Sequence, residues 1–216
     1  MPLLEVKRGL SAGYGNSQPA AAWLTTMGQL VVVSFQQAML LDGRGFQVRA
    51  GTLTTPLVGD IVITDTAAEM CADVASGTTM IPFSFGGSIR LATGTLHEYA
   101  LKAVATVSSA GTAFTPLPLK SNGAAAVSTA RVTAAGGVTV TAELATTTLR
   151  LWEYGGPTAA AAAEFAFTPL RWDPIAGPVL VGARCFYVQI AATGTGPSYY
   201  AHFDYIEVPT LMIDPS

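Results

Sequence analysis

The side chains best suited to acid–base chemistry are the two histidines and the carboxylates near them. His202 and Asp204 are two residues apart in a segment of alternating apolar and polar residues. Both are therefore expected on one face of a strand, where a carboxylate could orient an imidazole as a general base. No G-x-S-x-G sequence supplies a nucleophile, and Ser198 is merely nearby. We favour a polar outer strand face, opposite Tyr199, Ala201, Phe203 and Tyr205, over a hydrolase using His202.

The second histidine, His97, begins a sequence that is incomplete as a metal site. His97-Glu98 starts like a zinc-protease motif, but the second histidine of H-E-x-x-H is missing. The segment alternates as a strand does, so residues 97 and 98 point to opposite faces. His97 is interpreted as a histidine at a strand end.

Metal and cofactor motifs are also incomplete. Cys71 and Cys185 form no C-x-x-C pair, which leaves a disulfide or, the favoured interpretation, two separate buried thiols. The acidic residues between 60 and 73 lack the spacing of a calcium loop. Gly43-Arg-Gly45 and Gly194-Thr-Gly196 lack the third glycine and the following helix of a phosphate loop. We therefore expect no enzymatic activity, no cofactor and no metal ion.

The elements that would position these residues are mostly strands. Period-two hydrophobic patterns separated by turn residues predict an all-β, jelly-roll-like antiparallel β-sandwich of about ten strands. Turns are indicated at Asp42–Gly45 and at Thr193–Pro197. Gly86-Gly87 indicates a bulge or bend, and Pro116 and Pro118 make 113–120 an edge strand or an extended connection. The predicted strands are 29–41, 46–55, 60–64, 80–92, 96–107, 113–120, 127–134, 138–154, 164–172, 185–192 and 199–208.

Two details refine this pattern. Segments 127–134 and 138–154 flank Ala135-Gly136-Gly137 and are interpreted as a hairpin. Within the second segment the apolar residues change from even to odd positions, which predicts a bulge or two separate strands near Thr147. Thr66-Ala-Ala-Glu69 has the form of a capping box and predicts the one short helix.

The chain is predicted to hold one domain preceded by an arm. Residues 1–22 contain Gly9, Gly13, Gly15, Pro19 and three successive alanines, which indicates an extended N-terminal arm. No linker or internal repeat divides residues 23–216, so they are expected to form a single β-sandwich domain. Residues 159–163 are low-complexity alanine, most simply a surface loop or one helical turn.

Charge is scarce in this chain. Charged residues make up 12% of the 216 residues, about half the usual share of roughly 25%, and the mean hydropathy is +0.43. No apolar run reaches the ~18–20 residues of a spanning helix, and the charged start argues against a signal peptide. A net charge of −3 with only Lys7-Arg8 as a basic pair disfavours nucleic acid. Such a chain is expected to bury much of its surface against other subunits.

Low charge, abundant Thr, Ala, Val and Gly, and the glycine-rich arm together form a recognisable combination. The segments that carry it are 6–15, 126–154 and 185–208. The chain resembles the head decoration (cement) proteins of tailed bacteriophages. That resemblance implies a jelly-roll subunit, a trimer in preference to a dimer, which bridges major capsid subunits on the exterior of the virion after synthesis in the host cytoplasm.

Aromatic residues crowd the C-terminal third and belong to the core, a subunit interface or a glycan-binding platform. We favour core and interface. Under the capsid interpretation, the expected partner-interface residues are Val6, Arg8, Leu10, Tyr14, Trp152, Tyr154, Trp172 and Tyr199. The alternative is a tail or fibre module that recognises host glycan through Trp152, Trp172 or Tyr199.

Overall fold

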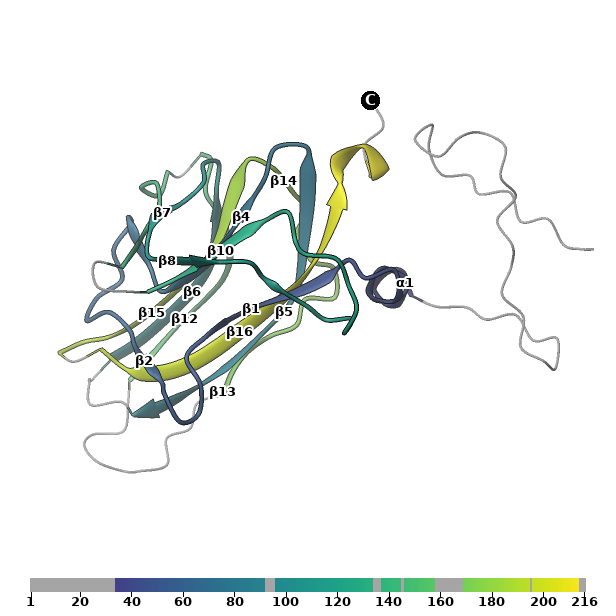
Figure 1. Ribbon diagram of the computed structural model, residues 1–216. Coiled ribbons are helices and arrows are strands. Elements are labelled where there is room, and N and C mark those ends of the chain that lie inside the picture. Colours follow the sequence, from purple (N-terminus) through teal and green to yellow (C-terminus); the bar gives the residue numbers. More distant parts are fainter. Residues whose placement is uncertain are drawn as a thin grey trace, which may run out of the picture.

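A computed structural model describes residues 34–91, 96–133, 137–144, 146–157, 169–194 and 196–213 of the chain. Within these residues the protein is an antiparallel β-sandwich with one short α-helix (Figure 1). The expected arm, residues 1–22, and the alanine-rich segment 159–163 lie outside the described residues.

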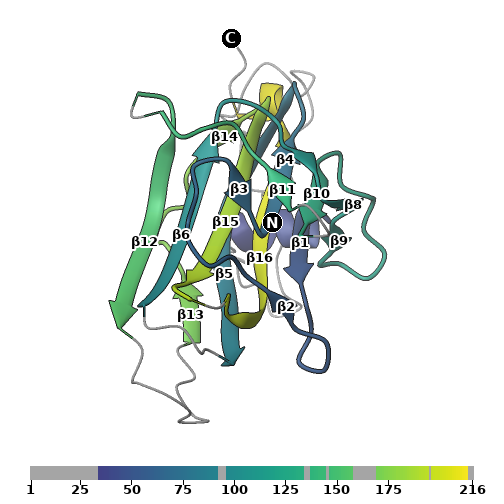
Figure 2. The same cartoon turned by 90° about the vertical axis from the view of Figure 1, so that its left-hand side faces the viewer.

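Eight strands form the two main layers (Figures 1 and 2). One layer has the order β13-β5-β16-β1 and the other β12-β6-β15-β4, with antiparallel pairing throughout. This arrangement is the strand order of a jelly roll, which confirms the predicted fold class. The strands of the first layer are β1 (Gly45–Ala50), β5 (Thr78–Leu91), β13 (Pro169–Trp172) and β16 (Ser198–Pro209); those of the second are β4 (Met70–Val74), β6 (Leu96–Val104), β12 (Leu149–Pro157) and β15 (Arg184–Ala192).

The core lies between these layers because alternate residues of facing strands point inward. Phe186 of β15 and Phe203 of β16 meet edge to face across the layers, with ring centroids 4.8 Å apart. Tyr199, Ala201, Phe203 and Tyr205 are all buried, while His202 and Asp204 on the opposite face are partly exposed. The predicted two faces of this strand are thus confirmed.

Shorter strands extend the layers. β2 (Leu57–Val58) pairs with β16, β14 (Leu180–Val181) with β5, and β9 (Leu117–Pro118) with β1. β10 (Thr129–Val132) and β8 (Thr112–Phe114) continue the second layer beyond β4. Because β8 and β9 end their sheets, the edge character predicted for 113–120 is confirmed.

A third, small sheet has the order β3-β11-β7, formed by β3 (Ala67–Ala68), β11 (Val138–Thr139) and β7 (Ser109–Ala110). The predicted hairpin between 127–134 and 138–154 is therefore wrong. β10 pairs with β4 and β8, and β12 pairs with β6, so neither arm pairs with the other. Val138 and Val140 are instead buried over the second layer.

The helix and one strand are not where the sequence predicts them. Segment 35–41, expected to be a strand, is the helix α1 (Phe35–Leu41), and residues 29–33 lie outside the described part of the chain. Ser34 caps this helix, since Gln37 N donates to Ser34 Oγ at 3.2 Å and Ser34 N donates to Gln37 Oε1 at 3.3 Å. The capping sequence Thr66–Glu69, expected to start a helix, runs through β3 toward β4.

Two further strands differ from expectation. Segment 60–64 makes only an isolated bridge, from Asp60 to Ala191, and leaves Ile61 and Val62 exposed. A three-residue apolar run without a continuous partner strand does not extend. Of segment 164–172, the described residues Pro169–Trp172 form β13.

The irregularities predicted within strands are partly confirmed. Near Thr147 a turn separates β11 from β12, as the change of phase indicates. Gly86-Gly87, however, lies inside the continuous β5, and the register shifts fall on either side of it. The glycines provide space instead, since a Cβ on Gly87 would lie 2.7 Å from Tyr200 O.

Candidate functional site

Buried thiol, charged and polar side chains gather on the outer face of the second layer, which the small sheet partly covers (Figure 2). The residues of β4, β6 and β15 that point away from the main core are buried as well, because β3 and β11 lie over them. The buried apolar and thiol residues of this covered face are Ala68, Cys71, Val104, Val138, Val140, Cys185 and Tyr187. Lys102, Asp73 and Gln189 are buried there as well.

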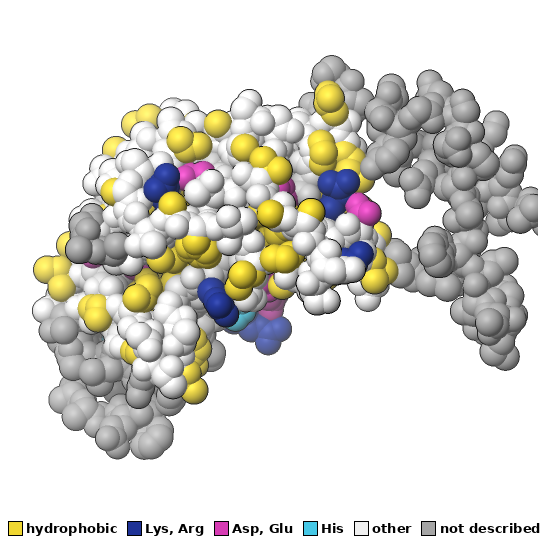
Figure 3. Space-filling view, viewed as in Figure 1, with side chains coloured by type: hydrophobic (Ala, Val, Ile, Leu, Met, Phe, Trp, Pro, Cys, Tyr) yellow, Lys and Arg dark blue, Asp and Glu magenta, His cyan; other side chains and the backbone are white. Residues whose placement is uncertain are grey.

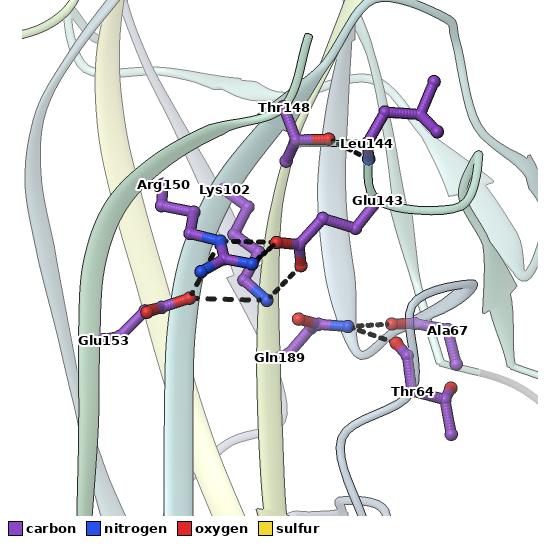
Figure 4. A network of polar contacts seen from close by, with 9 residues as sticks. All are labelled: Thr64, Ala67, Lys102, Glu143, Leu144, Thr148, Arg150, Glu153 and Gln189. Carbon is purple, nitrogen blue, oxygen red and sulfur yellow. Dashed lines mark hydrogen bonds and ion pairs between the residues drawn. The ribbon is translucent and has the colours of Figure 1, made fainter. Parts of the chain in front are cut away.

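A four-residue charge network lies at one end of the covered face (Figure 4). Lys102 Nζ of β6 lies 2.8 Å from Glu143 Oε2 and 3.5 Å from Glu153 Oε1 of β12. Arg150 binds the other oxygen of Glu143 and lies 3.8 Å from Glu153. The hydrogen bond from Lys102 is the main cause that holds the pKa of Glu143 below its ordinary value. The charges of the two cations and the two carboxylates cancel. The ion pairs join β6 to β12 and to the segment after β11.

Gln189 fixes the loop that borders this network. Its Nε2 donates to Thr64 O at 2.6 Å and to Ala67 O at 2.7 Å (Figure 4). Gln189 Oε1 and the hydroxyl of Tyr187, both buried, have no hydrogen-bond partner among the described residues.

An open cleft of about 460 Å³ adjoins the network. Ala100 and Lys102 belong to β6, while Val62 and Ile63 belong to the loop that Gln189 fixes. Tyr154, whose side chain is 48% exposed, also borders it. The lining is completed by Glu98, Tyr99, Glu153 and Gly155.

A cluster of thiols and a carboxylate lies at the other part of the covered face. Cys71 Sγ, Cys185 Sγ and a carboxylate oxygen of Asp73 lie within 4.8 Å of one another. Ser108 joins them, because its N and Oγ each donate to Asp73 at 2.7 Å and its Oγ lies 3.1 Å from Cys71 Sγ. Both cysteines are buried and unpaired, which agrees with the favoured prediction of separate thiols. Burial first, then Cys71 and Asp73, raise the pKa of the Cys185 thiol well above its ordinary value.

Glu69 is a buried carboxylate between β3 and β4. It accepts hydrogen bonds from Ile190 N at 2.8 Å and Asp60 N at 3.3 Å. Burial raises its pKa to about 8, against the opposing effect of these backbone donors. Glu69 therefore joins the loop after β2 to the C-terminal part of β15.

The residues predicted for a partner interface are only partly brought together. Trp152 and Tyr154 stack on β12 with ring centroids 6.5 Å apart, and Trp152 lies 6.1 Å from Phe85. Trp172 of β13 pairs with Phe85 across the strands, so these three aromatic residues share one side of the sandwich. Trp152 and Trp172 are partly buried against the core. Val6, Arg8, Leu10 and Tyr14 lie outside the described residues.

Tyr199 is fully buried, which corrects its predicted place in an interface or a glycan site. It belongs to the inward face of β16, where its alternation with Ala201, Phe203 and Tyr205 already places it, whereas Tyr200 lies on the other face. Among the predicted aromatic contact residues within the described ranges, Tyr154 is the one that is half exposed.

The contacts around both histidines indicate structural roles for these side chains. Asp204 accepts hydrogen bonds from Gln47 Nε2 at 2.9 Å and Ser84 Oγ at 3.1 Å, so neighbouring strands hold this carboxylate. The ring of His202 lies over Gly86, where a Cβ would be 3.0 Å from its Cε1. His97 is buried, with Nδ1 2.6 Å from the hydroxyl of Tyr99, and burial lowers its pKa.

Sequence reasoning missed the covered face itself. Lys102 and Glu143 are 41 residues apart, and so no local pattern joins them. Alternation in 96–107 places Lys102 opposite the core, where it would be expected in solvent. Glu143, in the segment after β11, binds its ammonium group instead, and Lys102 is buried.

Comparison with family models, with curated proteins and with solved structures found no match for this chain. Within the described part of the chain, none of the helices has the length and apolar character that a membrane-spanning helix needs.

Proposed function

We propose that the protein is a capsid decoration (cement) subunit of a tailed bacteriophage, which stabilises the head by bridging major capsid subunits. One observation carries this proposal: large aliphatic side chains are widely exposed on a surface with few charges (Figure 3). Exposed apolar side chains that gather in one place, unlike single scattered ones, are typical of protein interaction surfaces. A surface of this kind would be covered in an assembly.

Exposed apolar residues occur at the end of the sandwich that carries α1. This helix precedes β1, whose first residue pairs with Ile206, and the 3-10 helix η1 (Thr210–Met212) directly follows β16. Both helices therefore lie at the same end of β16. Leu41 is 68% exposed and Leu211 is 65% exposed; Phe35 and Ile213 are exposed with them. We call this surface the α1–η1 end.

A second apolar surface lies at the opposite end of β16. β2 pairs with Ser198 and Tyr199, the first residues of that strand. Val58 is 61% exposed and Ile61 is 60% exposed, and Val62 is exposed beside them. A bridging subunit needs two separate contact surfaces, and several modest contacts then act together as one strong attachment.

The α1–η1 end can be tested by substitution. We expect the native protein to self-associate, as a trimer in preference to a dimer, and the double variant Leu41→Ser, Leu211→Ser to shift to a lower mass in analytical ultracentrifugation. Leu144→Ser, which changes a leucine that is 54% exposed beside Glu143 on the second layer, is the matched control and should leave the mass unchanged. A double variant that sediments as the native protein does would remove this surface from the proposal.

The cleft favours a second candidate, recognition of host glycan. Half-exposed Tyr154 borders this open cleft beside Glu98 and Glu153, and an aromatic ring next to carboxylates can contact a sugar. Glycan-array binding that is lost in Tyr154→Ala and kept in Leu144→Ser would support this candidate. Failure of the native protein to bind any glycan on the array would reject it.

A further inference from the structure

The thiol–carboxylate cluster on the covered face has the composition of a metal site. Cys71 and Asp73 are two residues apart on β4, and Cys185 of β15 pairs directly with Asp73. Because side chains alternate along strands, all three point to the same face. Ser108, from the loop between β6 and β7, closes the group from above.

The donor atoms are close enough to surround one ion. The three side-chain ligand atoms of Cys71, Asp73 and Cys185 lie within 4.8 Å of one another. Thiolates around tetrahedral zinc are about 3.8 Å apart, from zinc–sulfur bonds of about 2.3 Å. Ser108 Oγ, at 3.1 Å from Cys71 Sγ and 2.7 Å from Asp73 Oδ2, adds a fourth donor.

Charge also fits a divalent ion. Two thiolates and one carboxylate carry three negative charges, and the ion would leave one. Arg131 Nε lies 3.5 Å from Asp73 Oδ2, and this buried nitrogen has no hydrogen-bond partner in the described part of the chain. A guanidinium beside a ligating carboxylate would balance the remaining charge and orient the ligand.

A disulfide between Cys71 and Cys185 fits the strand geometry less well than a metal ion does. Cys71 pairs with Tyr187 and Cys185 with Asp73, so the two cysteines are diagonal neighbours. Diagonal positions on antiparallel strands have Cα atoms about 7–8 Å apart, beyond the usual reach of a disulfide.

We propose that Cys71, Cys185, Asp73 and Ser108 bind one divalent ion of the zinc class. The ion replaces the two thiol protons, which leave to solvent. Since the small sheet buries the cluster, the ion is taken up as the chain folds. Its effect is to fasten β4, β15 and the loop before β7 together.

The test refolds the untagged full-length chain with one equivalent of cobalt(II), a spectroscopic substitute for zinc. We expect one bound ion per chain and the absorption of thiolate-to-cobalt charge transfer. Cys71→Ala and Cys185→Ala should each lose both. Val104→Ala, which removes a buried side chain of the same cluster without a donor atom, should keep them.

Protein that refolds without binding cobalt or zinc would overturn the proposal, and so would an ion retained by both cysteine variants. If the cysteine variants fail to fold, the native spectrum decides, because bound cobalt without thiolate absorption excludes these ligands. Neither result depends on whether the protein decorates a capsid.

Discussion

At the scale of the residue, Glu69 makes stability depend on pH. Its pKa is about 8 in the folded protein and near 4.5 when exposed. Between these values the folded state holds a proton that the unfolded state has lost. Its contribution is therefore fully present below pH 4.5, and stability falls as pH rises through about 8.

The expected result is a free energy of unfolding that is higher near pH 5 than near pH 8, with a smaller difference in Glu69→Gln. Urea denaturation at both pH values measures it. Glu98→Gln, a partly exposed glutamate on β6, serves as control and should keep the native dependence. If Glu69→Gln keeps the native pH dependence of the free energy of unfolding, a group other than Glu69 causes it.

Lys102 is the most buried member of the charge network, and its removal leaves Glu143 short of a partner. Breaking a buried ion pair from one side costs roughly 3 kcal/mol. We expect Lys102→Met to lose about that much, and Lys102→Met with Glu143→Leu to recover part of it.

Glu153→Gln is the control for that experiment, because its side chain is 47% exposed and its ion pairs are expected to contribute below about 1 kcal/mol. Chemical denaturation gives all the values. A double variant less stable than Lys102→Met would show that packing, rather than charge, determines the loss.

At the scale of the element, two segments share the sequence form of a capping box, and local rules cannot distinguish them. Ser34-x-x-Gln37 begins a helix, whereas Thr66-x-x-Glu69 does not. The Glu69 carboxylate bonds to Ile190 N, 121 residues away, instead of to a local cap. The structure of Thr66–Glu69 is therefore determined by long-range pairing, which a short stretch of sequence does not contain.

The cap on α1 is testable because no residue of this helix is buried. Removing a serine cap costs about 1 kcal/mol. We expect Ser34→Ala to speed hydrogen exchange of the 37–41 amides by roughly fivefold. Gln36→Ala, on the same helix but outside the capping box, should have a smaller effect, and equal rates in all three proteins would show that the cap contributes nothing.

The strands differ in how well the sequence predicts them. β15 and β16 were predictable almost to the residue. β16 alternates between buried and partly exposed positions over most of its length, and β15 is an almost continuous apolar run that is buried on both faces. The connection between β6 and β12 was not, because its short strands β7 to β11 attach to three different sheets. Consequently the covered face, which depends on that connection, could not be predicted either.

At the scale of the molecule, alternation and the turn residues between strands correctly indicated a β-sandwich, and its strand order is that of a jelly roll. The proposed role follows from the surface, since Leu41 and Leu211 at one end and Val58 and Ile61 at the other are exposed. A molecule with apolar surfaces at both ends is suited to lie between neighbours. If these ends are contact surfaces, the first expected consequence is that the protein associates with itself.

Native mass spectrometry of the full-length protein, over a range of concentrations that includes the low micromolar, measures that consequence. A structural subunit of this kind should form a stable oligomer, a trimer in preference to a dimer, that persists on dilution. A protein that remains monomeric at every concentration would contradict the proposal that these surfaces are built for assembly.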